Sequence, residues 1–94
     1  MLRVLLLQAL EGVERPMEVA VRATWDPEAS VWVAESDDVP GLVTEADDIE
    51  ALVAKLKVLI PELLDANGVA LSEQDEVAFV LTARRHERAE RHAA

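Results

Sequence analysis

The sequence predicts an α+β domain with the element order β-β-β-α-β, in which one amphipathic helix packs on one face of an antiparallel-dominated sheet. Three observations support this prediction. Residues 17–36 alternate between apolar and polar side chains on both sides of a short turn, as in a β-hairpin. Residues 47–66 repeat apolar residues at helical spacing. Residues 76–83 return to alternation, which predicts one more strand after the helix.

Length and composition limit the classes of function. Ninety-four residues form one domain with a thin core. The absence of cysteine excludes a disulfide framework and fits a cytoplasmic location. The net charge is −10, with seventeen acids and five cations before residue 84 and four arginines after residue 83. This balance argues against direct DNA binding and permits a basic partner.

Residues 1–16 are predicted to form an extension before the main domain, which covers 17–83. The extension is too short to span a membrane and lacks a signal-peptide cleavage site. A short helix is favoured, a strand over Arg3–Gln8 is the alternative, and Met17 is an alternative start for the module. The helix is favoured because four apolar residues share one helical stripe: Leu2, Leu6, Leu10 and Val13.

Trp25 and Trp32 are predicted to face each other across the hairpin. The predicted elements are a strand over 17–25, a turn over Asp26–Ala29 and a strand over 31–36. This register also places Arg22 opposite Glu35, an ion pair of opposite charges. Two tryptophans on one face are typical of core or interface packing rather than of a ligand site.

Pro40 and Gly41 predict a corner after the hairpin. Proline removes a backbone donor and so ends the second strand, and glycine tolerates backbone angles that other residues resist. A short third strand over 42–45 should then lie beside the second.

Asp47 is predicted to cap the helix, with Glu50 three residues later as the second half of a capping box. Pro61 removes one helical hydrogen bond, but the apolar stripe keeps its phase, so one bent helix is preferred to two. Asn67 and Gly68 should end the helix. The stripe that should face the sheet consists of Ile49, Leu52, Val53, Leu56, Ile60, Leu63 and Leu64.

The last predicted strand, residues 76–83, is apolar on both faces, so it should lie inside the sheet or at an interface. Val31, Val33 and Val80 should occupy the sheet face away from the helix, which favours a homodimer. Residues 84–94 are predicted to be a charged tail.

No set of residues predicts catalysis, a metal site or a cofactor. His86 and His92 are six residues apart, which does not place them on one helical face. We expect the acidic residues to cluster at one end of the sheet, as a docking surface for a basic protein or simply as a solvated face. A divalent cation is a weaker alternative use of the same oxygens. These residues are Asp37, Asp38, Glu45, Asp47 and Asp48.

The run from Val21 to Gly68 resembles a small bacterial family of uncharacterised domains related to the HicB-like antitoxins. The hairpin WDPEASVWVAES, the corner DDVPGL, the helix start TEADDIE and the segment KLKVLIPELL carry the resemblance. It covers about half of the chain, and it implies a partial ribonuclease-H-like β-β-β-α-β fold without catalysis.

The resemblance also implies a role, which is to bind and neutralise a small basic ribonuclease toxin. One departure matters, because the thirteen residues after Leu81 are too few for the DNA-binding domain that many such antitoxins carry. The sequence thus leaves three hypotheses: an antitoxin-like binding protein, a self-associating module without a toxin partner, and, last, a metal-dependent nuclease.

Overall fold

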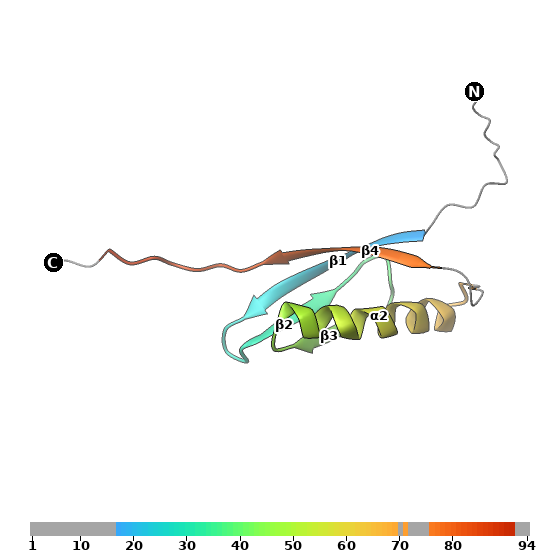
Figure 1. Cartoon of the computed structure of the whole chain (residues 1–94), viewed down its shortest axis with the longest axis horizontal. Helices are drawn as coiled ribbons and strands as arrows, with labels where there is room; N and C mark the ends of the chain where they lie inside the picture. Colours follow the sequence, from blue (N-terminus) through green and yellow to red (C-terminus); the bar gives the residue numbers. More distant parts are fainter. Residues whose placement is uncertain (1–16, 70, 72–75, 92–94) are drawn as a thin grey trace, which may run out of the picture.

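The computed structural model describes residues 17–69, 71 and 76–91. Its elements are β1 (Met17–Asp26), β2 (Val31–Glu35), β3 (Val43–Ala46), α2 (Ile49–Ala66) and β4 (Val77–Arg84). This order confirms the predicted β-β-β-α-β arrangement, with α2 lying along one face of the sheet (Figure 1). The helix or strand predicted within residues 1–16 lies outside the described residues.

The four strands form one mixed sheet in the order β3-β2-β1-β4. β2 pairs antiparallel with both β1 and β3, whereas β4 pairs parallel with β1. A parallel neighbour needs a long crossover, which α2 and the segment after it provide. Two antiparallel pairs and one parallel pair make the sheet antiparallel-dominated, as predicted.

The hairpin has the predicted register. Trp25 lies opposite Trp32, and Arg22 lies opposite Glu35. In the turn, the Asp26 carboxylate accepts hydrogen bonds from the backbone N–H groups of Glu28 (3.0 Å) and Ala29 (3.3 Å), and Ser30 takes a positive φ of 56°. The side chain of Asp26 therefore shapes this turn, as its sequence position suggests.

The core lies between the sheet and α2. From β1 it takes Val19, Val21 and Ala23, each at most 5% exposed, and from the corner it takes Val39 and Leu42. The helix contributes one fully buried residue per turn: Leu52, Leu56, Ile60 and Leu64. These four belong to the predicted stripe, and burial of each such side chain contributes about 1.5–3 kcal/mol.

The corner at Pro40–Gly41 is hydrogen-bonded to the end of the helix. Gly41 has a φ of +87°, a region that favours glycine. The Asn67 side chain donates to the Pro40 carbonyl oxygen at 3.1 Å and to the Leu63 carbonyl oxygen at 2.7 Å. Leu42 is buried in the core, and β3 begins at Val43, one residue later than predicted.

The helix start differs from the prediction. Asp48, not Asp47, is the N-cap, and its carboxylate accepts from the backbone N–H of Ala51 at 2.7 Å. The third helical position is therefore Ala51, so Glu50 does not occupy the position that a capping box requires. The predicted Asp47–Glu50 capping box is wrong because the helix begins one residue later than expected.

The prediction of one helix through Pro61, ended by Asn67 and Gly68, is confirmed. Pro61 lies inside a single helix, which ends at its C-cap, Asn67. Gly68 adopts φ +86°, its N–H donates to the Asp65 carbonyl, and the N–H of Val69 donates to the Leu64 carbonyl at 2.9 Å. This pair of bonds is a Schellman motif, which satisfies carbonyls at the helix end.

Two predictions about the sheet are corrected. β4 is not internal: within the described residues it pairs only with β1, so the alternative that placed it inside the sheet is wrong. Val31 is only 9% exposed and does not contribute to an open surface, whereas Val80 is 50% exposed.

Candidate functional site

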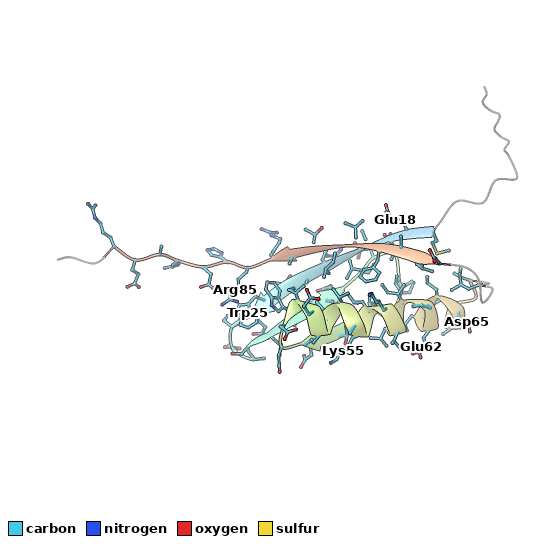
Figure 2. The ribbon with its side chains drawn as sticks, viewed as in Figure 1. Glu18, Trp25, Lys55, Glu62, Asp65 and Arg85 are labelled. Atoms are coloured by element: carbon cyan, nitrogen blue, oxygen red, sulfur yellow. The ribbon has the colours of Figure 1, made fainter. Side chains whose placement is uncertain are left out.

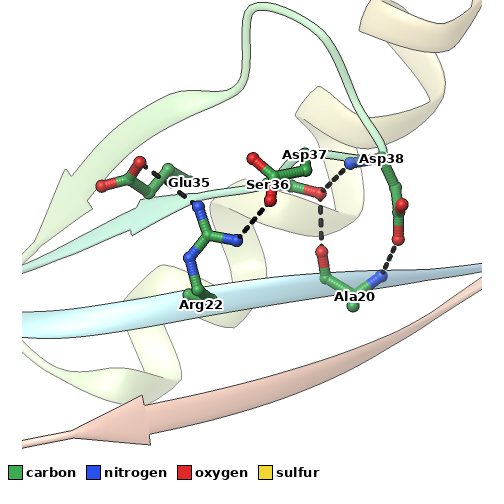
Figure 3. Close-up of polar contacts among 6 residues, drawn as sticks. All are labelled: Ala20, Arg22, Glu35, Ser36, Asp37 and Asp38. Atoms are coloured by element: carbon green, nitrogen blue, oxygen red, sulfur yellow. Dashed lines mark hydrogen bonds and ion pairs between the residues drawn. The ribbon is translucent and has the colours of Figure 1, made fainter.

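The segment after β2 is bonded to β1 by side chains (Figure 3). The Ser36 hydroxyl donates to the Ala20 carbonyl oxygen at 2.6 Å and accepts from the Asp38 N–H at 3.0 Å. The Asp38 carboxylate accepts from the Ala20 N–H at 2.8 Å. The side chains of Ser36 and Asp38, which follow the end of β2, therefore satisfy the backbone N–H and C=O of Ala20. Asp38 thus has a structural role that the sequence did not suggest.

Arg22 joins two of the acidic residues beside this segment. Its guanidinium donates to Asp37 at 3.1 Å and lies 3.5 Å from a Glu35 carboxylate oxygen (Figure 3). The hydrogen bond to Asp37, together with the charge of that carboxylate, raises the pKa of Arg22 above its usual value. The side chain of Asp37 is nevertheless 88% exposed, so it remains accessible to a partner.

Glu45, Asp47 and Asp48 lie at the other end of β2 and β3. The register places Glu35 opposite Val43 at one end of this strand pair and Trp32 opposite Ala46 at the other. All three acids line a hollow of about 310 Å³. The predicted single cluster of five acids is therefore wrong, because the strand pair separates Asp37 and Asp38 from the other three.

Metal chemistry gains no support from this arrangement. In residues 17–69, 71 and 76–91, no group of three or more histidine, aspartate or glutamate side chains has a geometry that could hold a metal ion. Asp48 is already engaged as the helix cap.

In the same described residues, no helix has the length and apolar content needed to cross a bilayer.

The two tryptophans form an edge-to-face pair. Their ring centroids are 5.5 Å apart, with an interplanar angle of 62°. Trp32 packs against the core, and the guanidinium of Arg85 lies 4.2 Å from the centroid of a Trp25 ring (Figure 2). The charged tail therefore begins with a cation–π contact to the hairpin. Sequence analysis missed this contact because Arg85 and Trp25 are sixty residues apart.

A groove of about 810 Å³ lies between α2 and β4. Its apolar side chains come from both elements, with charged Lys57 and Glu76 beside them. Phe79 and Leu81 are only half-buried there, although they face the helix side of the sheet. In the sequence, the groove is indicated by the apolar residues on both faces of β4. The other groove-lining residues include Val53, Leu56, Ile60, Pro61 and Val77.

The sheet face away from α2 carries a mixture of acidic and apolar side chains. We call this the open face, because no described element covers it. Figure 2 places Glu18 on this side of the sheet, and Glu62 and Asp65 on the outer side of α2. On the open face, Val43 is 71% exposed and Val33 is half-buried. Strand alternation places four further residues there: Arg22, Glu35, Glu45 and Val80.

Comparison with known families identifies the domain. Residues 18–93 match the family described as Domain of unknown function (DUF1902). The chain belongs to this family. The match to DUF1902 extends well beyond the half of the chain that carries the resemblance noted above. No curated protein gives a significant match.

A solved structure is similar to the chain. The crystal structure of a hypothetical protein from the extremely thermophilic bacterium Thermus thermophilus shares 56% sequence identity with it. The alignment covers 77% of this chain and 99% of the other, with a TM-score of 0.64. At this identity the two proteins share their fold, and the descriptions of the family (unknown function) and of this relative (hypothetical protein) name no activity.

Proposed function

We propose that this DUF1902 domain is a non-catalytic binding protein whose open face receives a basic protein. The observation that carries the proposal is the composition of that face. Exposed Val43 and half-buried Val33 alternate there with the carboxylates of Glu35 and Glu45, and Glu18 and Arg22 lie on the same face. Protein interfaces commonly combine an apolar centre with a polar rim, and complementary charge directs the approach of the partner.

The charge of the domain supports a basic partner. Most of its acids lie in the body, and the described residues contain three ion pairs, two of which share Arg22. Carboxylates such as Asp37 remain exposed even when paired. A negative surface of this kind accelerates association with a positive partner.

The resemblance to the HicB-like antitoxins specifies the partner further. It implies that the basic protein is a small ribonuclease toxin, which the domain neutralises in the cytoplasm by covering it. The β-β-β-α-β order agrees with the fold that this resemblance implies. The proposal requires no catalytic group, cofactor or metal in the domain.

The resemblance implies that the toxin is encoded beside the antitoxin, so the experiment measures binding of the purified chain to any small basic protein encoded next to its gene, by isothermal titration calorimetry. The variant Asp37→Lys/Glu45→Lys reverses two charges on or beside the open face. It should weaken binding at least about tenfold, because like charges across an interface cost more than about 1.4 kcal/mol. Asp38 and Asp48 are left unchanged because both make backbone hydrogen bonds.

The matched control is Glu62→Lys/Asp65→Lys, which makes the same charge change on the outer side of α2 (Figure 2). It should weaken binding less than about threefold, since long-range charge effects are screened at physiological salt. Absence of a complex, or equal losses in the two variants, would show that the open face does not bind this partner.

A second candidate function is a self-associating structural module without a toxin partner. The apolar groove and the unpaired edge of β4 favour it, because neither feature contributes to an acidic docking surface. The two functions are compatible, since the residues that define the docking surface lie on β1, β2 and β3, whereas this edge belongs to β4.

A further inference from the structure

Among the described residues, no strand covers the outer edge of β4. Within the described residues only β1 pairs with it, so the N–H and C=O groups on its other side have no strand partner. The strand is eight residues long and has no charged side chain from Val77 to Ala83. Monomeric proteins usually protect such edges with lysine, proline, a bulge or a very short strand. An edge without these features is a template for another strand.

Apolar side chains accompany this edge on both faces of the sheet. On the open face, Val80 is 50% exposed. On the helix side, Phe79 and Leu81 line the groove beside α2 and are only half-buried. A strand that pairs with β4 would therefore cover apolar surface as well as satisfy backbone groups, and both effects favour association.

We propose that the partner at this edge is a second copy of the chain, whose β4 pairs antiparallel with β4 about a two-fold axis. The pairing would join the two four-stranded sheets into one continuous sheet. In such a contact every pair of different residues occurs twice, and a residue on the axis lies opposite its own copy. The interface is defined as Glu76–Arg84 of both copies.

The charges of the strand select one register. When Val80 lies opposite the partner's Val80, Arg84 lies opposite the partner's Glu76, and the reciprocal pair forms at the other end. Both residues are exposed. In the same register Leu81 lies opposite the partner's Phe79, so the two grooves adjoin. Opposite charges and apolar pairs directly across two strands stabilise antiparallel pairing.

Other registers lose this complementarity. A shift of two residues in one direction places Arg84 opposite the partner's Ala78. A shift in the other direction places Glu76 opposite the partner's Thr82. Either shift leaves charged residues facing uncharged ones, so we expect a single register.

The location of the edge also favours a second copy. The groove and Glu76–Arg84 both lie within residues 18–93, the part that matches the family. Every copy of this chain therefore carries both halves of the contact. The inference is independent of the proposed basic partner, which binds the open face.

Sedimentation velocity of the full chain tests this proposal, over about 1–200 µM to include the weak range of small interfaces. The unmodified chain should dimerise. Glu76→Arg and Arg84→Glu each place like charges together twice, and each should raise the dimer dissociation constant about tenfold. The double variant Glu76→Arg/Arg84→Glu restores opposite charges and should return the constant to within about threefold of the original.

Val80→Lys should have the largest effect, because it places two ammonium groups together at the two-fold axis. Near-ultraviolet circular dichroism of the tryptophan pair checks that each variant is folded. Val43→Lys is the matched control, since Val43 is exposed on β3 at the opposite edge, and it should leave the dissociation constant unchanged. A monomer at the highest concentration, a dimer unaffected by Val80→Lys, or no recovery in the double variant would each overturn the proposal.

Discussion

The two edges of the sheet are built in opposite ways. β3 has four residues, includes charged Glu45, and the carbonyl oxygen of Glu45 accepts a hydrogen bond from the Lys55 side chain at 2.6 Å. β4 has eight residues and no charge before its last residue, Arg84. The β3 edge is protected by its short length, its charge and the Lys55 hydrogen bond, whereas the part of the chain that the structure describes gives the β4 edge no such protection. The difference indicates which side of the sheet is available for assembly.

The connections to the helix explain this asymmetry. Only Asp47 and Asp48 separate β3 from α2, so the helix must fold back over β3 and β2. The longer connection over residues 67–76 then carries the chain to the far side of β1. The helix therefore covers the β3 side more fully than the β4 side, and the groove follows from this offset.

The largest loss of stability is predicted for a substitution in the core beneath the helix. Leu56→Ala should lower the free energy of unfolding by about 2–5 kcal/mol, because Leu56 is fully buried and the cavity cannot collapse completely. Leu81→Ala removes the same atoms from the half-buried β4 side, and its effect should be smaller at low protein concentration. Urea denaturation followed by tryptophan fluorescence measures both.

Protein concentration distinguishes the two positions further. If β4 pairs with a second copy, the loss caused by Leu81→Ala should grow with concentration, since dimer formation stabilises the folded state by mass action. The loss caused by Leu56→Ala should change less. Equal losses of stability in Leu56→Ala and Leu81→Ala would mean that the helix covers the β3 side and the β4 side of the sheet equally.

A smaller effect is expected at the helix start beside β3. Asp48→Ala should lower stability by about 1 kcal/mol, because it removes the cap on the Ala51 N–H. Asp47→Ala removes the same charge one residue earlier and should cost less than about 0.5 kcal/mol. Thermal unfolding of the two variants side by side separates the cap from the general charge effect, and the reverse order would contradict the assignment of Asp48.

Local patterns allowed the sequence to predict the β1–β2 register and the helix stripe. Trp25 and Trp32 had to share a face, and a slip of one residue would have separated them. The cap was missed because Asp47 and Asp48 are both acceptable caps, and only the backbone angles of Asp48 decide between them. Sequence spacing contains little information on such a choice.

Features that depend on distant pairing were not predicted. The parallel contact of β4 with β1 joins residues sixty positions apart, as Met17 opposite Val77 shows. The division of the acidic set follows from the antiparallel arrangement of β2 and β3, which sends Asp37 and Asp47 to opposite ends. The use of Asp38 on the Ala20 N–H depends on β1 continuing beyond β2. The open groove likewise depends on where α2 lies relative to β4.

The smallest predicted effect concerns the protection of β3. Lys55→Met keeps an unbranched side chain on α2 but removes the donor to the Glu45 carbonyl. Stability should fall by only about 0.5 kcal/mol, because water replaces Lys55 as the hydrogen-bond donor to the Glu45 carbonyl. Lys57→Met is the control, since it removes the same charge from the same helix. The dimer dissociation constant should not change in Lys55→Met, because β3 remains short and keeps charged Glu45. New association through β3 in this variant would instead show that a single lysine, rather than strand length and charge, keeps that edge from pairing.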